Sequence, residues 1–237
     1  MCSFKMKLSI IVPAHNEQDN IINVIEKIEH SLDIEHELVV VNDNSTDATV
    51  GLVQRLSRQY GNIKLVHNKS DKGFANALKT GFDNISTDIV VPVMADLCDD
   101  LAAIPKMLNK INEGYDVVCG SRYIKGGARL GGSRLKGFLS FWAGKSLSFL
   151  LDLPTHDIAN AFKMYRKEVI DNIDIQSQAF EISMEIPLKA YYLGFKITEI
   201  PTVWNERTRG QSSFRVLKLL PVYIKLYIWA IFKRLVR

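Results

Sequence analysis

The sequence has few cysteines, and they lie far apart. Its 237 residues contain only Cys2, Cys98 and Cys119, with no CxxC pair. Disulfide frameworks and structural zinc sites are built from closely spaced cysteines, so this spacing argues against both. Scarce, unpaired cysteines are typical of a protein in a reducing compartment. The chain length suits one large domain or two small ones.

Long uninterrupted apolar runs are also missing. The first run, residues 8–12, is too short for a signal peptide or a membrane span. Residues 216–232 are apolar but are interrupted by Lys218, Pro221 and Lys225, whereas a span needs about 20 apolar residues. The segment therefore predicts an amphipathic helix at a membrane interface, with a helix packed on the core as the plainer alternative.

Acidic residues are absent from Arg207 to the C-terminal Arg237. This stretch holds eight basic residues, and the formal net charge is +4, so the rest of the chain carries 4 − 8 = −4. An acidic body with a basic, apolar tail predicts an anionic surface such as a membrane as partner, and no nucleic acid. Residues 138–151, which are amphipathic and rich in aromatic side chains, are expected to join the tail at that surface.

Several common motifs do not occur. No GxGxxG follows a strand, which argues against a dinucleotide site. Residues 144–146 read GKS, but the glycine that a phosphate loop needs five positions earlier is Leu139. Because HExxH and GxSxG are missing too, the chemistry of zinc proteases and α/β-hydrolases is not indicated.

Short apolar segments alternate with amphipathic ones along the first half of the chain. The apolar segments predict strands and the amphipathic segments predict helices. This alternation is typical of an α/β fold with a largely parallel sheet and helices on both faces. In the second half, residues 120–137 are rich in glycine and basic residues and are interpreted as a mobile basic loop. The predicted strands are residues 8–12, 38–41, 63–66, 89–94 and 116–119, with a further helix at 181–193 and a strand at 196–200.

Polar residues follow three of these strands, at 15–17, 42–43 and 96–100. Ligands of open parallel sheets bind at the carboxyl ends of the strands, so the three groups should converge on one edge. Asp96, Asp99 and Asp100 would repel one another there, and a positive partner is therefore expected. The plainer interpretation is that Asp99 and Asp100 cap the helix that follows them.

Seven segments resemble, in their order, those of family 2 glycosyltransferases, and the most similar branch is that of polyprenyl-phosphate sugar transferases of the dolichyl-phosphate mannose synthase type. The resemblance covers residues 8–215. It implies a GT-A catalytic domain over residues 1–215, with a mixed, mostly parallel sheet flanked by helices, and an amphipathic interface helix over 216–237. The segments are SIIVPAHNEQDNI, VVVNDNSTDAT, NKSDKGFANALKTGF, VMADLCDD, VVCGSRY, THDIANAFKMYR and FEISMEIPLKAYYLGFKITEIPTVWNERTRGQSSF.

The resemblance implies an inverting transfer of sugar from a GDP- or UDP-linked donor to a polyprenyl or dolichyl phosphate, by a peripheral protein at the cytoplasmic face of a membrane. It also implies Mg²⁺ or Mn²⁺, hard cations that bind carboxylates together with substrate phosphates. The first Asp of the family's DxD motif is replaced by Met94, and the next metal-side residue by Cys98. The metal site is therefore expected to involve Asp96 with Asp99 or Asp100.

Other positions match the family's contacts to the donor and to phosphate. The chain departs from the family at Asn42, where the family has Asp, and at Ser213, where it has Lys; Arg209 or Arg215 is expected to supply that charge. His15 has a plainer interpretation as a turn residue. A glycine at position 73 lets the backbone approach phosphate or sugar closely. The matching residues are Pro13, His15, Glu17, Val41, Asp43, Lys72, Gly73, Ala95, Asp96, Arg209 and Ser212.

The resemblance also implies catalytic roles. A lipid phosphate is already ionised at neutral pH, with a second pKa of about 6, so no strong base is needed. Asp157 and Glu185 are therefore expected to orient the sugar or the acceptor, although Glu185 also fits a solvated helix face. Arginine contacts phosphate with two parallel hydrogen bonds, which suits Arg122 and Arg207. The predicted catalytic residues are Asp96, Asp157, Glu185, Arg122 and Arg207.

Two further functions stay open at this point. One is a family 2 transferase with a saccharide or protein acceptor. The other is a non-catalytic nucleotide-sugar-binding partner that lost turnover with the Asp at Met94. Metal-dependent hydrolysis of the donor would separate the binding partner from both enzymes. The sequence does not indicate which sugar or base is used, nor the oligomeric state.

Overall fold

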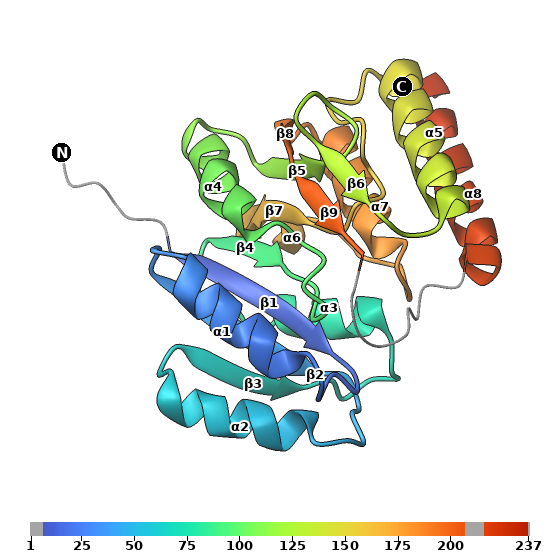
Figure 1. The fold of residues 1–237 in the computed structure, drawn as a ribbon. Coiled ribbons are helices and arrows are strands. Elements are labelled where there is room, and N and C mark those ends of the chain that lie inside the picture. The colour runs from blue at the N-terminus through green and yellow to red at the C-terminus, as the bar shows by residue number, and fades with distance from the viewer. Residues whose placement is uncertain (1–6, 207–215, 237) are drawn as a thin grey trace.

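The computed structural model describes residues 7–206 and 216–236. Its centre is a seven-stranded sheet with the order β3-β2-β1-β4-β7-β5-β8 (Figure 1). Neighbouring strands are parallel except for β7, which runs antiparallel to both β4 and β5. This confirms the predicted mixed, mostly parallel sheet. The strands are β1 (Leu8–Ala14), β2 (His36–Asn42), β3 (Ile63–His67), β4 (Ile89–Pro92), β5 (Val117–Ser121), β7 (Lys163–Arg166) and β8 (Ile197–Pro201).

Helices cover both faces of the sheet (Figure 1). Successive side chains of a strand point to opposite faces, so Ile10 packs in one core cluster with α1, α2 and α4, while Ile11 packs in the other with α3 and α7. This alternation explains why the central strands are apolar throughout. The helices are α1 (Ile21–Ser31), α2 (Thr49–Gln59), α3 (Phe74–Phe82), the short 3₁₀ turn η1 (Leu101–Ala103), α4 (Ile104–Asn112), α5 (Arg134–Leu151), α6 (Lys167–Asp171), α7 (Ile182–Leu193) and α8 (Val216–Leu235).

Residues 120–137, expected to form a mobile basic loop, contain regular structure instead. Strand β6 (Ala128–Leu130) pairs in parallel with β9 (Val203–Asn205) to form a second, two-stranded sheet. Helix α5 then starts after Ser133, whose hydroxyl accepts a hydrogen bond from the Lys136 N–H. The local sequence gives no sign of β6 because its partner strand lies far along the chain.

Helices α5 and α8 lie side by side at one end of the molecule (Figure 1). Leu147 and Leu151 of α5 and Ala230 of α8 share a small core with α7. The Tyr227 hydroxyl also donates a hydrogen bond to the Ser146 hydroxyl, at 2.9 Å. Within residues 7–206 and 216–236, no helix has both the length and the apolar character needed to cross a bilayer.

Candidate active site

The ends of β1, β2 and β3 form the first part of the site. The Asp43 carboxylate, just after β2, accepts hydrogen bonds from the Gly73 N–H at 3.0 and 3.2 Å and from the Asn68 amide at 2.7 Å. The Asp43 carbonyl oxygen lies 2.6 Å from His15 Nδ1. Asp43 therefore ties together the three loops that follow the three strands, including the loop with the exposed Lys72.

The turn after β1 is joined to the turn before α2. Asn16 adopts the left-handed conformation, with φ 53°, and its side-chain oxygen accepts a hydrogen bond from the Thr46 N–H at 2.8 Å. The Glu17 N–H donates to the Thr49 hydroxyl at 2.9 Å. Pro13 and Val41 face each other across β1 and β2. The structure thus brings together the residues predicted to hold the nucleotide, apart from Ala95, Asp96 and those beyond the described ranges.

The loop after β4 carries the predicted metal ligands. Leu97 adopts a left-handed conformation, with φ 61°, which reverses the chain between Asp96 and Asp99. The Asp96 carboxylate accepts a hydrogen bond from the Cys98 N–H at 3.2 Å, and the Asp99 carboxylate accepts one from the Met94 N–H at 2.8 Å. Left-handed residues other than glycine are costly and often mark functional turns.

Only one of these carboxylates has the plainer capping role. The Asp100 side chain accepts a hydrogen bond from Ala102 at the start of η1, whereas Asp99 bonds back toward β4. Asp96 and Asp99 both line the large cavity described below, and Ala95 between the strand and this turn is buried. Their role as metal ligands stays a prediction.

Asp99 has an unusual electrostatic environment. Burial raises the pKa of its carboxyl group to about 7, and repulsion from Asp96 and Asp100 adds to the effect. The Met94 N–H and Arg122 act in the opposite direction. Two neighbouring buried carboxylates of this kind favour a bound cation.

Arg122 and Asp157 form a buried ion pair at the end of β5. Arg122 donates three hydrogen bonds to the Asp157 carboxylate: from its backbone N–H at 3.0 Å, from Nε at 2.7 Å and from Nη2 at 2.8 Å. Asp157 is fully buried. Burial would lower the pKa of Arg122, but Asp157 outweighs that effect and the pKa is raised. The guanidinium group is therefore charged and fixed in direction.

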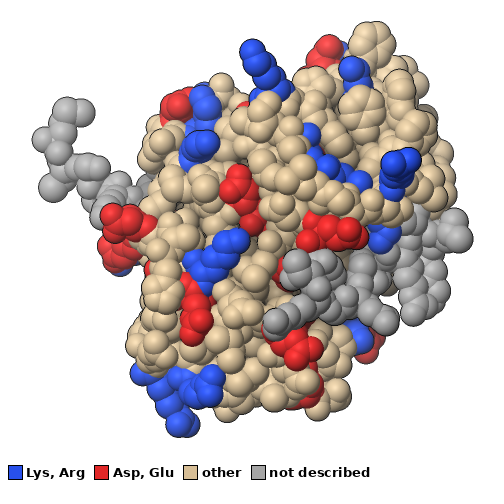
Figure 2. All heavy atoms as spheres, viewed as in Figure 1, with Lys and Arg blue, Asp and Glu red and all other residues tan. Residues whose placement is uncertain are grey.

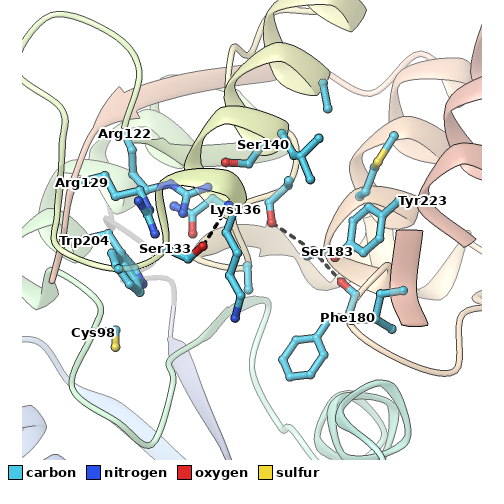
Figure 3. Close-up of a pocket in the computed structure, with 18 of the residues that line it drawn as sticks. Cys98, Arg122, Arg129, Ser133, Lys136, Ser140, Phe180, Ser183, Trp204 and Tyr223 are labelled. Carbon is cyan, nitrogen blue, oxygen red and sulfur yellow. Dashed lines mark hydrogen bonds between the residues drawn. The ribbon is translucent and has the colours of Figure 1, made fainter. Parts of the chain in front are cut away.

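A cavity of about 520 Å³ connects these groups. Arg122, Arg129 and Trp204 lie on one side of it, Phe180, Ser183 and Tyr223 lie on the other, and Lys136 projects between them (Figure 3). The guanidinium of Arg129 lies over the Trp204 ring, 5.1 Å from its centre. With Asp96 and Asp99 in the same lining, this end of the cavity holds charges of both signs.

The two-stranded sheet joins three of the segments that line this end. The Asn205 N–H donates to the Cys98 carbonyl at 3.0 Å, and the Glu206 N–H donates to the Leu130 carbonyl at 2.9 Å. The Glu206 carboxylate accepts a hydrogen bond from the Gly132 N–H at 2.8 Å. The turn with the predicted metal ligands, the glycine-rich segment and the segment before Arg207 are therefore held to one another.

The other end of the cavity is apolar and lies between α5 and α8. It is lined from α5 by Leu139, Trp142 and Ala143 and from α8 by Leu220 and Ile224. Such a cavity has the size typical of small-molecule sites. Its two ends differ in character, so it fits an amphipathic ligand with an anionic head.

Several predicted residues lie elsewhere. Glu185 is buried and is not among the residues that line the cavity. Its carboxylate accepts hydrogen bonds from the Gln176 and Ser177 N–H groups and pairs with Lys189. Burial would raise its pKa, but these bonds lower it below the usual value. Its catalytic role thus has no geometric support here, and Arg207, Arg209, Ser212 and Ser213 lie outside the described residues.

Several residues of the cavity had only weak signals in the sequence. Arg129 and Lys136 lie in the glycine-rich segment, and the concentration of basic residues there was the sequence feature that could have pointed to an anion-binding role. Trp204 lies three residues before Arg207, a predicted catalytic residue. Lys163, which is fully buried and does not line the cavity, was missed too; its only sign was a charged residue within the apolar run AFKMY.

Comparisons with known proteins agree with this fold. The sheet and helices match glucosyl-3-phosphoglycerate synthase from Mycobacterium tuberculosis in complex with Mn²⁺, UDP and glucosyl-3-phosphoglycerate, with a TM-score of 0.69 and 20% identity over 97% of this chain and 80% of that one. The same enzyme with Mg²⁺ and UDP gives a TM-score of 0.67 at 18% identity, with coverage of 97% and 79%. The protein is thus of the GT-A fold class, as the sequence predicted.

The family model for glycosyl transferase family 2 matches residues 9–174, and the chain belongs to that family. It is 33% identical over 215 residues to the dolichol-phosphate mannosyltransferase of Pyrococcus furiosus, which covers 89% of this chain but only 60% of that protein's length. It is also 28% identical over 235 residues to the polyprenol monophosphomannose synthase of Mycolicibacterium smegmatis, covering 96% of this chain and 88% of the relative.

Proposed function

We propose that the protein is an inverting glycosyltransferase that moves a sugar from a GDP- or UDP-linked donor to a polyprenyl or dolichyl phosphate. The observation that carries the proposal is the two-ended cavity, in which Asp96, Asp99 and Arg122 lie at one end and an apolar slot lies between α5 and α8 at the other. The charged end fits the donor diphosphate beside Asp96 and Asp99 and the acceptor phosphate beside Arg122, and an isoprenoid chain fits the slot. The names of the two curated relatives agree with this class of acceptor.

The chemistry needs little help from a base. An oxygen of the acceptor phosphate forms the new bond to the anomeric carbon, and the bond from that carbon to the donor diphosphate breaks with its electron pair going to the diphosphate. The acceptor phosphate is already ionised near neutral pH. The protein therefore has to position two anions of like charge close together and stabilise the leaving group.

The residues present fit a divalent cation. Asp96 and Asp99 supply hard oxygen ligands in one cavity, and repulsion from Asp96 and Asp100, which adds to the effect of burial on the pKa of Asp99, is a repulsion that a bound cation would relieve. Within the described part of the chain, no group of three or more His, Cys, Asp or Glu side chains is arranged to hold a metal. Mg²⁺ typically binds one or two carboxylates and completes its shell with water and substrate phosphates. When bound, it would stabilise negative charge on the leaving diphosphate.

Basic residues complete the charged end. Arg122, Arg129 and Lys136 line the cavity from β5, β6 and α5. Asp157 holds Arg122 in a fixed orientation, and Trp204 supports Arg129. Because these residues lie where the apolar slot begins, we assign them to the phosphate of the acceptor.

The outer surfaces of α5 and α8 suit a membrane. Exposed apolar side chains recur along both helices, and Lys233 and Arg234 occupy the last turn of α8. In Figure 2 the surface in the region of α5 is largely uncharged with scattered basic residues. We therefore place the protein peripherally at the cytoplasmic face of a membrane, held by apolar side chains and anionic headgroups. The exposed residues are Leu135, Phe138, Trp142, Phe149 and Leu150 on α5 and Val222, Ile224, Ile228, Phe232 and Leu235 on α8.

Transfer is tested directly with GDP- and UDP-sugars, a polyprenyl phosphate and Mn²⁺, with and without EDTA. We expect a lipid-linked sugar from one donor, and no product with EDTA. Asp96→Asn should abolish most of the turnover, while Asp152→Asn, an exposed carboxylate of the α5 C-cap, serves as the matched control. A lipid product that forms equally well in EDTA would disprove the metal requirement.

The acceptor and the membrane are tested separately. A product formed only with a water-soluble saccharide or protein acceptor would replace the lipid acceptor, and donor binding without any transfer or hydrolysis would indicate a binding partner. Vesicles containing anionic phospholipid should sediment the protein, and the pair Ile228→Ser and Phe232→Ser should release it. Sedimentation that is unaffected by these substitutions would refute the assignment of this face.

A further inference from the structure

Lys163 is a buried charge that the proposed chemistry does not use. It is the first residue of β7 and is fully buried. It lies opposite Cys119 of β5. Cys119 and Tyr165, two residues further along β7, both belong to the apolar cluster beneath α3 and α7. Alternation along the strand places Lys163 on this same face. A charged side chain in such a position carries a large desolvation cost unless its hydrogen bonds are complete.

The Lys163 ammonium group finds three acceptors, all of them backbone carbonyls. It donates to the carbonyl of Ile158 at 2.9 Å, to that of Ser183 in α7 at 3.1 Å, and to that of Asn160. A protonated lysine has three N–H donors, so the number of donors matches the number of acceptors. Burial lowers the pKa of Lys163 to about 8, and Asp157 partly opposes this, so the group is still mostly protonated near neutral pH.

Every carbonyl of the loop from Asp157 to Asn160 is held. The Asp157 carbonyl accepts a hydrogen bond from the Asn160 N–H at 3.3 Å. The Ala159 carbonyl accepts one from the Ser183 hydroxyl at 3.3 Å, and those of Ile158 and Asn160 turn toward Lys163. Figure 3 shows Ser183 at this wall, across the cavity from Arg122 and Arg129.

This loop lines the cavity and also reaches Arg122 through Asp157. Ala159, Asn160 and Ala161 line the cavity, and Asp157 in the same loop fixes Arg122. Carbonyl oxygens that faced the cavity would repel a phosphate group. The loop keeps such oxygens bonded within the protein, and Lys163 supplies the donors for two of them.

We propose that Lys163 is a positioning residue for the anion-binding end of the cavity, where it draws the carbonyls of the 157–160 loop and of Ser183 into the core and so holds Asp157 and Arg122 in place. This rests on the proposed function, because the anion in question is the acceptor phosphate. Lys163 does not touch the substrate in this arrangement. Its effect is transmitted through the loop.

The test compares Lys163→Met with the wild type. Methionine fills similar space but leaves three buried carbonyls without their donor. We expect the KM for the polyprenyl phosphate to rise about tenfold or more, and the affinity for the nucleotide to stay within about twofold. Lys163→Gln retains two N–H donors, so its KM for the polyprenyl phosphate should lie between those of the wild type and Lys163→Met. This variant also tests the proposal if Lys163→Met does not fold. Lys167→Met, which alters an exposed lysine paired with Asp171, is the matched control.

The outcome separates this proposal from the proposed function. Farnesyl phosphate binding, followed by the fluorescence of Trp142 and Trp204 in the cavity, gives a readout that does not depend on turnover. If the wild type binds farnesyl phosphate but transfers no sugar, only the proposed function fails. A Lys163→Met or Lys163→Gln protein that binds the lipid phosphate like the wild type overturns the role of Lys163. If the variants lose nucleotide affinity and lipid affinity in parallel, the role of Lys163 is overturned as well. If the wild type binds no farnesyl phosphate, both the role of Lys163 and the proposed function are overturned.

Discussion

The region around β1, β2 and β3 that we propose binds the donor (the donor region) and the region around the cavity that we propose binds the acceptor (the acceptor region) are held together in different ways. Around β1, β2 and β3, side chains bond mainly to backbone groups of neighbouring loops, as Asp43 does with Gly73 and Asn16 does with Thr46. Around the cavity, side chains bond and stack with one another, as in the Arg122–Asp157 pair and the Arg129–Trp204 contact.

This difference predicts different sensitivities. A side chain that accepts from backbone N–H groups can be replaced by another acceptor of similar shape: Asn42 stands where the family usually has Asp, and its side-chain oxygen accepts a hydrogen bond from the Ser45 N–H at 3.0 Å. A buried ion pair depends on both partners, because removing one leaves an uncompensated charge. Substitutions of the buried charges of the acceptor region should therefore have the larger effects, and each should leave the donor region intact.

Arg122→Met should give the largest effect. It leaves the fully buried Asp157 without its partner and removes a positive charge from the cavity. We expect kcat/KM for transfer to fall about 100-fold or more, with little change in nucleotide affinity measured by calorimetry. Arg122→Lys should recover only part of the loss because lysine cannot form the two-point contact.

Lys110→Met, in an exposed pair with Glu113, is the control for Arg122→Met. If nucleotide affinity falls together with transfer in Arg122→Met, the donor and acceptor regions are not independent. The predicted difference in their sensitivities would then be wrong.

The stability of the acceptor region should depend on pH through Lys163. Its pKa is lowered from 10.5 to about 8 in the folded protein, so between these values the unfolded chain binds more protons. The free energy of unfolding of the wild type should therefore rise with pH in this window relative to Lys163→Met. The upper limit is about 3 kcal/mol, from a difference of 10.5 − 8 pKa units. Urea unfolding of both proteins at pH 7.5 to 10.5 measures this difference in the free energy of unfolding. Parallel pH profiles of the two proteins would contradict the prediction.

Asp43→Asn should weaken the donor region moderately. The substitution removes the negative charge that the Gly73 N–H and the Asn68 amide share, but it keeps one acceptor oxygen. We expect the Kd for the nucleotide to rise about tenfold and the KM for the lipid phosphate to stay constant. Asp33→Asn in an exposed loop is the control. An altered lipid KM would show that the regions are coupled.

Trp204→Leu should give the smallest effect. It removes the ring beneath Arg129, an interaction of about 0.5–1 kcal/mol at an accessible site. The KM for the lipid phosphate should rise about two- to fivefold, while Trp204→Phe should recover most of it. Steady-state kinetics with a varied lipid phosphate decides this, and an unchanged KM in Trp204→Leu would remove Arg129 from the acceptor site.

Much of the donor region could be predicted because its signals are local. Each strand is a short apolar run, and Pro13, His15, Glu17 and Asp43 directly follow or end such runs. The carboxyl ends of parallel strands must meet at one edge. The position of the turn with Asp96, Asp99 and Asp100 could be predicted for the same reason, whereas the different hydrogen bonds of Asp99 and Asp100 could not.

The acceptor region was harder to predict because its contacts join distant segments. Strand β7 enters the middle of the sheet antiparallel to its neighbours, and β6 finds its partner only in β9. Glu185 fitted an inward-facing catalytic residue, but the structure commits its carboxylate to the backbone at Gln176 and Ser177. Spacing along a helix indicates which residues share a face, but not which loop that face will meet.

By itself the sequence determined the α/β class, the order of the strands along the chain and the carboxylate-rich turns that follow them, because apolar periodicity and turn residues act over a few positions. Only the tertiary structure decided that Asp157 pairs with Arg122, that Lys163 bonds to three carbonyls, and that α5 and α8 enclose an apolar slot. These features depend on which surfaces are buried against each other when the sheet closes, and burial sets the strength of every charge and hydrogen bond within them.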